Sequence, residues 1–391
     1  MLSQQISRVS ALGVLMALAV SACGSSSSST TGTGSGSAAC QGTPAKPGFT
    51  NGVAQVSGGA RQLSGAGSTF INPMLSVWAA TYAGKAGVQV AYQSIGSGGG
   101  IAQVQAGTVD FGASDAFMKD ADIAKAKSPI VQIPMVLAPV VVTYNLPGIR
   151  SGVQFDGETL GKIFAGKITK WNDPALVALN SGKKLPDLAI AVVHRSDGSG
   201  TTDIFTDYLT KESPTWVTTL GGASTSRGKT VAWPVGIGGK GNEGVSAAVG
   251  SPSGNSGTPG GIGYVELGYA IQQNLTFGNV KNKAGNFIEP CVQTVTAATV
   301  GAQYPPDLRF DLTDQSGTNA YPITGTTWLL VYKAQTAADK GAALVNFISW
   351  ALTNGQDLTL AINYAPLGSE LQAKAIAQLK TLTYNGQTIV K

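Results

Sequence analysis

From about residue 60 onward, short apolar or alternating runs are interspersed with segments whose apolar residues recur at helical spacing. Residues 88–92 alternate as a strand does, and residues 188–193 form a second strand-like run. Residues 71–82, 337–352 and 370–379 carry their apolar side chains at the spacing of one helical face. Strands and helices that alternate in this way predict an α/β protein.

The length of the chain favours two lobes. It has 391 residues, of which 43% are hydrophobic. A chain of this length is longer than those that usually fold around a single hydrophobic core. Two apolar β-rich runs, residues 133–146 and 321–333, are candidates for crossing between lobes. Lobe 1 would then hold residues 48–145 plus 328–391, and lobe 2 would hold residues 146–327. A single continuous sheet domain is the alternative.

The N-terminus predicts export and a lipid anchor. Residues 1–22 have the pattern of a signal peptide, with an apolar stretch too short to span a bilayer. The tetrapeptide VSAC, which ends at Cys23, is similar to a bacterial lipobox, whose cysteine becomes acylated. Residues 23–47 are rich in Gly, Ser and Thr, which predicts a flexible tether. We therefore expect a lipoprotein on the outer face of a bacterial cell membrane; an ordinary signal peptide is the alternative.

The remaining cysteines and the charges exclude some classes of function. Cys40 and Cys291 would lie in a compartment that permits disulfides, so they can pair or stay as two free thiols. With one histidine, His194, and no cysteine cluster at zinc spacing, neither a metal site nor a cofactor is expected. The net charge is only +5, and no basic run is interleaved with aromatic residues, which argues against a nucleic-acid partner.

Three segments join a glycine-rich turn carrying Ser or Thr to a helical pattern: residues 65–70, 96–100 and 197–201. A helix start offers unpaired N–H groups and the positive end of the dipole, and glycine lets its backbone approach a ligand. Each segment alone can equally be a turn with a helix cap. Together they favour an anion site built from several helix starts.

Two charged residues refine this expectation. Arg195 lies at the end of a predicted strand, so its guanidinium can point into the site, with Asp197 close enough to orient it. Asp115 would repel an anion unless the ligand brings a proton to share. Hydrogen phosphate carries such a proton at neutral pH and sulfate does not, so Asp115 predicts a preference for phosphate. A surface charge for Arg195 and a turn or cap for Asp115 are the alternatives.

The segments GAGSTF (65–70), IGSGGG (95–100), VDFGASD (109–115) and RSDGSGT (195–201) resemble, in this order, the PstS family. PstS is the phosphate-binding subunit of the phosphate-specific ABC importer. The resemblance covers about residues 60–391 and continues through residues 161–164, 170–173, 233–236, 239–242 and 263–266. It implies a two-lobed periplasmic-binding-protein fold, type II-like, in which two crossover segments form the hinge of closure.

The resemblance also implies a set of phosphate ligands, with Asp115 as the acceptor, Arg195 as the charge and Asp197 holding Arg195 in place. The phosphate-binding residues would be Thr69, Phe70, Ser97, Asp115, Arg195, Ser199, Gly200 and Thr201. Ser68 and His194 depart from the family pattern, and neither is expected to touch these ligands.

These features predict a solute-binding protein that captures inorganic phosphate and delivers it to a membrane permease served by a cytoplasmic ATPase. It is not expected to be an enzyme, since it offers no Ser-His-Asp layout and no metal-ligand cluster. The Gly-Lys pair at 239–240 lacks the spacing of a nucleotide-binding loop. A phosphate-sensing or surface adhesion role on the same scaffold is the alternative.

Overall fold

The computed structural model describes residues 38–41, 43–44 and 52–390. The predicted signal peptide, Cys23 and most of the predicted tether lie outside these residues. Across the described ranges, no helix combines the length and apolar character needed to cross a membrane.

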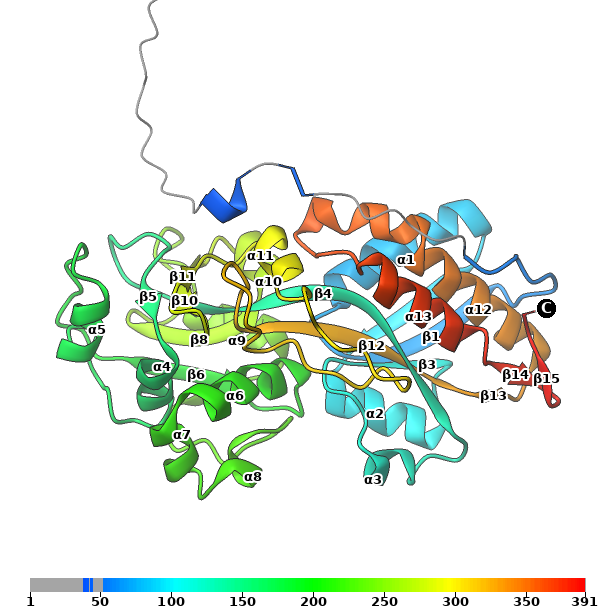
Figure 1. The fold of residues 1–391 in the computed structure, drawn as a ribbon, viewed down its shortest axis with the longest axis horizontal. Coiled ribbons are helices and arrows are strands. Elements are labelled where there is room, and N and C mark those ends of the chain that lie inside the picture. Colours follow the sequence, from blue (N-terminus) through cyan, green and yellow to red (C-terminus); the bar gives the residue numbers. More distant parts are fainter. Residues whose placement is uncertain (1–37, 42, 45–51, 391) are drawn as a thin grey trace, which may run out of the picture. The chain divides into compact units, whose positions relative to one another are not determined.

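A nine-stranded mixed sheet forms the centre of the described chain (Figure 1). Its strands are β1 (Gln62–Gly67), β2 (Gln89–Ser94), β3 (Phe111–Ser114), β4 (Ile130–Tyr144), β6 (Ala191–Arg195), β7 (Ile237–Gly239), β8 (Gly261–Glu266), β9 (Thr276–Phe277) and β12 (Thr324–Tyr332). They follow the order β2-β1-β3-β12-β4-β8-β6-β7, with β9 also beside β4. Two small sheets join β11-β10-β5 and β13-β14-β15. Their strands are β5 (Gln154–Phe155), β10 (Asn279–Lys281), β11 (Phe287–Ile288), β13 (Ala334–Gln335), β14 (Thr383–Tyr384) and β15 (Gln387–Thr388).

The long strand β4 connects two groups of strands. Its first part pairs antiparallel with β12, up to Pro139 opposite Thr324, and its last part pairs with β8 from Val140 onward. One group is therefore β2, β1, β3 and β12, and the other is β8, β6 and β7. The α/β class and the two-lobed arrangement are confirmed, while the residue limits of the two lobes stay a prediction.

Helices pack against both groups of strands (Figure 1). The α-helices are α1 (Asn72–Ala86), α2 (Ser97–Ala106), α3 (Asp120–Ile123), α4 (Gly157–Phe164), α5 (Pro174–Leu179), α6 (Gly200–Glu212), α7 (Pro214–Thr219), α8 (Ala223–Ser226), α9 (Gly241–Val249), α10 (Leu267–Gln272), α11 (Val292–Ala297), α12 (Ala338–Leu352) and α13 (Ser369–Leu379). Short 3-10 helices occupy Ala38–Cys40, Asn354–Leu358 and Leu360–Ile362. The predicted helix over residues 71–82 is α1, which buries its apolar face as expected.

The predicted strand over residues 188–193 begins later than expected. The carbonyl of Leu188 accepts from the N–H of Trp171, and the N–H of Ile190 donates to the carbonyl of Thr169. These residues are thus bonded to the neighbouring loop, and β6 spans Ala191–Arg195 instead. Arg195 is the last residue of β6, so its predicted place at the end of the strand is confirmed.

Pro134, one of the prolines that interrupt the first predicted crossover, is accommodated at a bulge inside β4. Pro134 lies opposite Trp328 and Val136 opposite Thr327, so Met135 is an extra residue at a bulge. Its carbonyl accepts a hydrogen bond of 3.0 Å from the Nε2 of Gln356. A bulge is where a strand tolerates the missing N–H of proline, so the long strand persists.

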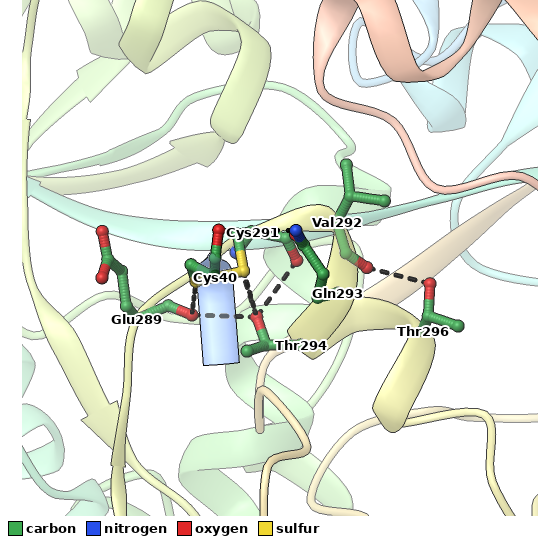
Figure 2. The surroundings of a disulfide bond; sticks show 7 residues. All are labelled: Cys40, Glu289, Cys291, Val292, Gln293, Thr294 and Thr296. Atoms are coloured by element: carbon green, nitrogen blue, oxygen red, sulfur yellow. Dashed lines mark hydrogen bonds between the residues drawn. A yellow bond between two sulfur atoms is a disulfide. The ribbon is translucent and has the colours of Figure 1, made fainter. Parts of the chain in front are cut away.

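A disulfide joins Cys40 to Cys291 (Figure 2), with 6.0 Å between their Cα atoms. Cys40 ends the first 3-10 helix and Cys291 precedes α11. The bond ties the start of the described chain to a residue 251 positions away in the sequence.

Loss of this disulfide should lower the free energy of unfolding. Closing so long a loop restricts the unfolded chain, so Cys291→Ser should cost about 2–4 kcal/mol in denaturant unfolding. Cys40→Ser should lower the free energy of unfolding by the same amount. Reductant should lower the free energy of unfolding of the wild type to that of the variants and leave the variants unchanged. Equal stability of oxidised wild type and variants would contradict the expectation.

Candidate functional site

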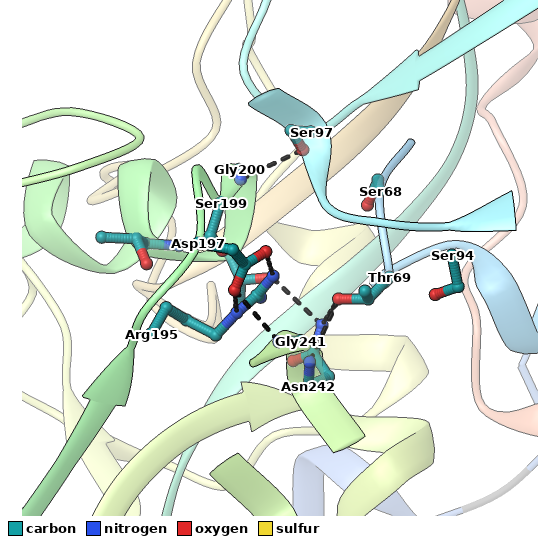
Figure 3. Close-up of polar contacts among 12 residues, drawn as sticks. Ser68, Thr69, Ser94, Ser97, Arg195, Asp197, Ser199, Gly200, Gly241 and Asn242 are labelled. Carbon is teal, nitrogen blue, oxygen red and sulfur yellow. Dashed lines mark hydrogen bonds and ion pairs between the residues drawn. The ribbon is translucent and has the colours of Figure 1, made fainter. Parts of the chain in front are cut away.

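The three glycine segments meet where strands end and helices begin. They connect β1 to α1, β2 to α2 and β6 to α6. The N–H of Gly98 donates to the carbonyl of Gly198 at 2.8 Å, and the N–H of Gly200 donates to the Ser97 hydroxyl at 3.0 Å. A fourth turn, which joins β7 to α9, lies beside them and supplies Asn242 (Figure 3).

Gly200 allows this close approach. A Cβ atom at this position would lie 2.6 Å from the Cβ of Asp115 and 2.6 Å from the Ser97 hydroxyl oxygen. Both distances are shorter than non-bonded atoms tolerate, so a larger residue would hold α6 away from α2 and the loop after β3.

Arg195 and Asp197 form a buried bidentate ion pair. The guanidinium Nε lies 2.8 Å from one carboxylate oxygen of Asp197, and Nη2 lies 2.6 Å from the other. Burial alone would raise the pKa of Asp197, but hydrogen bonds and charge from Arg195 outweigh it and hold that pKa below its usual range. Asp197 thus fixes the guanidinium as predicted, and the remaining Nη1 lies 3.3 Å from the Thr201 hydroxyl.

The polar residues that meet at these turns, among them Thr69, Ser97, Arg195 and Asp197, form a cluster. Asp115 is its second carboxylate and is 3% exposed. It accepts hydrogen bonds from Ser68 at 2.6 Å, Thr327 at 2.6 Å and Ser97 at 3.3 Å. Burial raises the pKa of Asp115 to about 6, and these three hydroxyls and the charge of Arg195 oppose the rise. The carboxyl therefore changes its protonation state in a range close to neutral pH.

The expectation that Ser68 stays apart from the predicted ligands is wrong. Its hydroxyl oxygen lies 2.6 Å from both carboxylate oxygens of Asp115, and it also accepts the N–H of Phe70 at 3.0 Å. The serine is completely buried where the chain leaves β1, so its hydroxyl needs a partner inside the cluster. Thr327 was missed altogether because it lies on β12, far away in the sequence.

Asn242 is a further residue that sequence reasoning missed. Its side-chain nitrogen donates to the Thr69 hydroxyl at 2.7 Å (Figure 3). The same nitrogen donates to the Thr201 hydroxyl at 3.2 Å. Its backbone N–H also donates to the Thr69 hydroxyl, at 3.1 Å. The signal that could have found it is the glycine turn before α9, which joins a strand to a helix as the other three segments do, although it carries no Ser or Thr.

Other predicted residues have local roles in this structure. The Ser199 hydroxyl caps α6 by accepting the N–H of Thr202. Phe70 is fully buried and meets the ring of Tyr364 edge-on. His194 stacks on Trp233, with 4.9 Å between ring centroids, which fits a structural role for the histidine.

Glu266 is a completely buried carboxyl next to the cluster. The hydroxyl oxygen of Tyr364 lies 2.9 Å from its Oε2 and 2.5 Å from the carbonyl oxygen of Phe70. A tyrosine hydroxyl has one proton and can donate to only one of these acceptors. If it donates to the carbonyl of Phe70, the shorter contact, a proton on Glu266 is needed to bridge Oε2 and the hydroxyl. Burial raises the pKa of Glu266 to about 8, in the same direction.

Glu266→Gln should flatten the pH dependence of stability. The pKa of the folded carboxyl exceeds the ordinary 4.5, so the folded chain binds more protons and loses stability as pH rises from 4.5 to about 8. Glutamine keeps the bonding pattern of the protonated acid without that loss. At pH 9 we expect the free energy of unfolding of the variant to exceed that of the wild type by roughly 3–5 kcal/mol.

Thermal and denaturant unfolding between pH 4 and 9 measures this difference. Glu370→Gln, at an exposed glutamate, is the matched control and should follow the wild-type curve. The groups that act electrostatically on Glu266 include Asp115, Tyr269 and Tyr364. Parallel curves for wild type and Glu266→Gln would contradict an ionising glutamate.

The cluster as a whole combines one guanidinium held by Asp197, several hydroxyl and backbone donors and a further carboxyl acceptor, Asp115. Such a set suits a small oxyanion that also carries a proton. In the part of the chain that the structure describes, no group of three or more His, Cys, Asp or Glu residues could hold a metal ion.

Residues 29–354 match the family model of the PBP superfamily domain. The chain is 42% identical over 325 residues to the phosphate-binding protein PstS of Pasteurella multocida, covering 82% of this chain and 91% of that protein. It is 34% identical over 384 residues to the phosphate-binding protein PstS3 of Mycobacterium bovis, covering 93% of this chain and 96% of that protein.

Solved structures show the same fold. A high-affinity periplasmic phosphate-binding protein (PfluDING) bound with phosphate matches with a TM-score of 0.64 at 20% identity, covering 81% of this chain and 93% of that one. A phosphate-binding protein from Stenotrophomonas maltophilia matches with a TM-score of 0.60 at 19% identity, covering 81% of this chain and 94% of that one. These structures show that the chain has the periplasmic-binding-protein fold, and the sequence matches establish that it belongs to the PstS family of phosphate-binding proteins.

Proposed function

We propose that the chain captures inorganic phosphate at this cluster, between Arg195 and Asp115, and delivers it to the permease of a phosphate ABC importer. The observation that carries the proposal is the placement of a guanidinium fixed by Asp197, two threonine hydroxyls and a buried carboxyl where four helices begin. The guanidinium balances part of the ligand charge, and hydroxyls and amides supply neutral donors.

The phosphate ligands would be those named from the sequence, with two adjustments. The backbone N–H groups of Phe70 and Gly200 already donate to Ser68 and Ser97, so they would contribute to the ligand only by exchanging those bonds. The Ser199 hydroxyl accepts from the N–H of Thr202 and keeps its own proton for the ligand. Asp115 would accept the proton of hydrogen phosphate, and Arg195 with Thr69 and Thr201 would face its unprotonated oxygens. This division supports phosphate over sulfate, since sulfate has no proton to offer at neutral pH.

We also propose that acylated Cys23 anchors the chain to the outer face of the bacterial cell membrane, in the periplasmic or cell-wall space. Support comes from the lipobox-like tetrapeptide and from the tether that follows it. No catalytic step belongs to this proposal: His194 stacks on Trp233, and its Nδ1 faces the carbonyl of Arg195 rather than a nucleophile.

Calorimetric titration of the purified, phosphate-stripped chain with phosphate and then sulfate tests the binding function. Tight binding of phosphate and weak binding of sulfate are expected; absence of phosphate binding would overturn the proposal. Uptake of labelled phosphate by cells that lack the chain, restored by wild type, tests delivery. Binding without any effect on uptake would favour the sensing or adhesion role.

Incorporation of labelled palmitate tests the anchor. The wild-type chain should take up the label and fractionate with membranes, and Cys23→Ala should do neither. Cys291→Ser serves as the control, because that cysteine is joined to Cys40 and should leave labelling unchanged.

A further inference from the structure

The Asn242 side chain uses all of its hydrogen-bonding groups within the cluster. Its Oδ1 accepts the backbone N–H of Glu266 at 3.0 Å, which fixes the orientation of the amide because that N–H can only donate. Both hydrogens of Nδ2 then point to hydroxyls, one to Thr69 and one to Thr201. Asn242 is fully buried, so water does not compete for these bonds.

Each threonine hydroxyl has two lone pairs, and the structure fills both on each of them. Thr69 accepts from the side-chain and backbone nitrogens of Asn242, at 2.7 and 3.1 Å. Thr201 accepts from the Asn242 amide at 3.2 Å and from Nη1 of Arg195 at 3.3 Å. The single proton is then the only bonding capacity that each hydroxyl has left.

We propose that Asn242 is a positioning residue that makes the Thr69 and Thr201 hydroxyls obligate donors to unprotonated oxygens of the bound anion. The inference rests on the proposed phosphate-binding function and deepens it. A free threonine hydroxyl can donate or accept, and it would also accept from a protonated ligand oxygen. With its lone pairs occupied it can only donate, so the ligand proton is directed away from this side of the site.

The carboxyl of Asp115 and the pair of threonine hydroxyls have opposite roles, which completes this division. Asp115 accepts bonds and would take the ligand proton, while the threonine pair offers protons only. The ligand class is therefore a tetrahedral anion with at least two unprotonated oxygens and one hydroxyl, held in one orientation. The selectivity of the site would then come from Asn242 together with Asp115.

Asn242→Asp is the sharpest test, because it keeps the shape and the acceptor for Glu266 but replaces both donors with an acceptor. The hydroxyls would then donate to the new carboxylate and be lost to phosphate. We expect phosphate affinity to fall by roughly 10- to 100-fold in calorimetric titration. Asn286→Asp, at an exposed asparagine outside the cluster, is the matched control and should bind as wild type does.

Combining Asn242→Asp with Thr69→Val and with Thr201→Val separates orientation from a merely structural role. If Asn242 acts through both hydroxyls, the loss of affinity caused by Asn242→Asp should shrink in each valine background, fall to about twofold or less when both valines are present, and persist in Thr69→Ser and Thr201→Ser. A bond that only holds the site closed would couple to Thr69 alone, since Thr201 and Asn242 belong to the same group of strands and helices. Coupling to Thr69 alone, or additive effects with both threonine variants, would overturn the proposal.

Two further measurements keep the outcome unambiguous. Thermal unfolding of each variant checks that it is folded, and Asn242→Ala, which removes the donors without adding charge, must also weaken binding. A wild-type chain that binds no phosphate would overturn the proposed function and this inference with it. Wild-type binding together with unchanged affinity in Asn242→Asp would overturn the inference alone.

Discussion

Arg195→Ala should weaken phosphate binding by roughly 10²- to 10³-fold, because truncating one member of a buried, hydrogen-bonded charge pair costs about 2–5 kcal/mol in binding. The Arg195 side chain is 1% exposed and makes two short bonds to Asp197. Without it, the carboxyls of Asp197 and Asp115 would face a dianion with no guanidinium between them. Repulsion is then added to the lost attraction.

Calorimetric titration of three variants separates charge from geometry. Arg195→Lys restores the charge but not the bidentate fork, so its affinity should fall between those of wild type and Arg195→Ala. Arg61→Ala, at an exposed arginine, is the control for loss of net charge and should bind as wild type does. Thermal unfolding checks that each variant is folded. Near-normal affinity in Arg195→Ala would show that the anion binds elsewhere.

The sequence predicted the parts of the site that depend on local pattern. A glycine turn with a hydroxyl, placed between a strand and a helix, carries its own structural reason, so the segments before α1, α2 and α6 lie where they were expected. The bond between Arg195 and Asp197 also spans only two residues. Such features follow from short-range geometry and need no knowledge of the fold.

The residues that were missed or misjudged depend on long-range contacts. Thr327 meets Asp115 across 212 residues of sequence, and Asn242 meets Thr69 across 173. No periodicity connects such positions, because the sheet order brings them together and not their spacing. Ser68 was misjudged for the same reason, since its neighbours in sequence do not show that its hydroxyl turns toward Asp115. The sequence thus indicated which anion the site suits, but not how the hydroxyls are held.

Asp115→Asn should change which anion the site prefers. The wild-type carboxylate can accept the proton of hydrogen phosphate but repels sulfate, whose oxygens are all acceptors. The asparagine amide can still accept through Oδ1 and can also donate through Nδ2, so sulfate gains a partner. We expect the ratio of phosphate to sulfate affinity to fall by roughly 10²- to 10⁴-fold at pH 8.

Asp110→Asn is the matched control, because Asp110 lies in the same segment but bonds to Ser64 and Lys340 instead of the cluster. Its affinity ratio should equal that of the wild type. An unchanged ratio of phosphate to sulfate affinity in Asp115→Asn would show that Asp115 does not determine the selectivity. The hydrogen-bond donors of the cluster would then have to account for it.

The pH dependence of sulfate binding gives a second, independent test of the same carboxyl. With the pKa of Asp115 near 6, the side chain is ionised at pH 8 and becomes protonated as pH falls below that value. A protonated Asp115 can donate to sulfate as the asparagine does, so wild-type sulfate affinity should rise as pH falls from 8 to 5. Asp115→Asn has no proton to gain there, and its sulfate affinity should stay nearly constant over the same range. Sulfate itself does not titrate in this interval, so a flat wild-type profile would mean that the ionisation of Asp115 does not exclude sulfate.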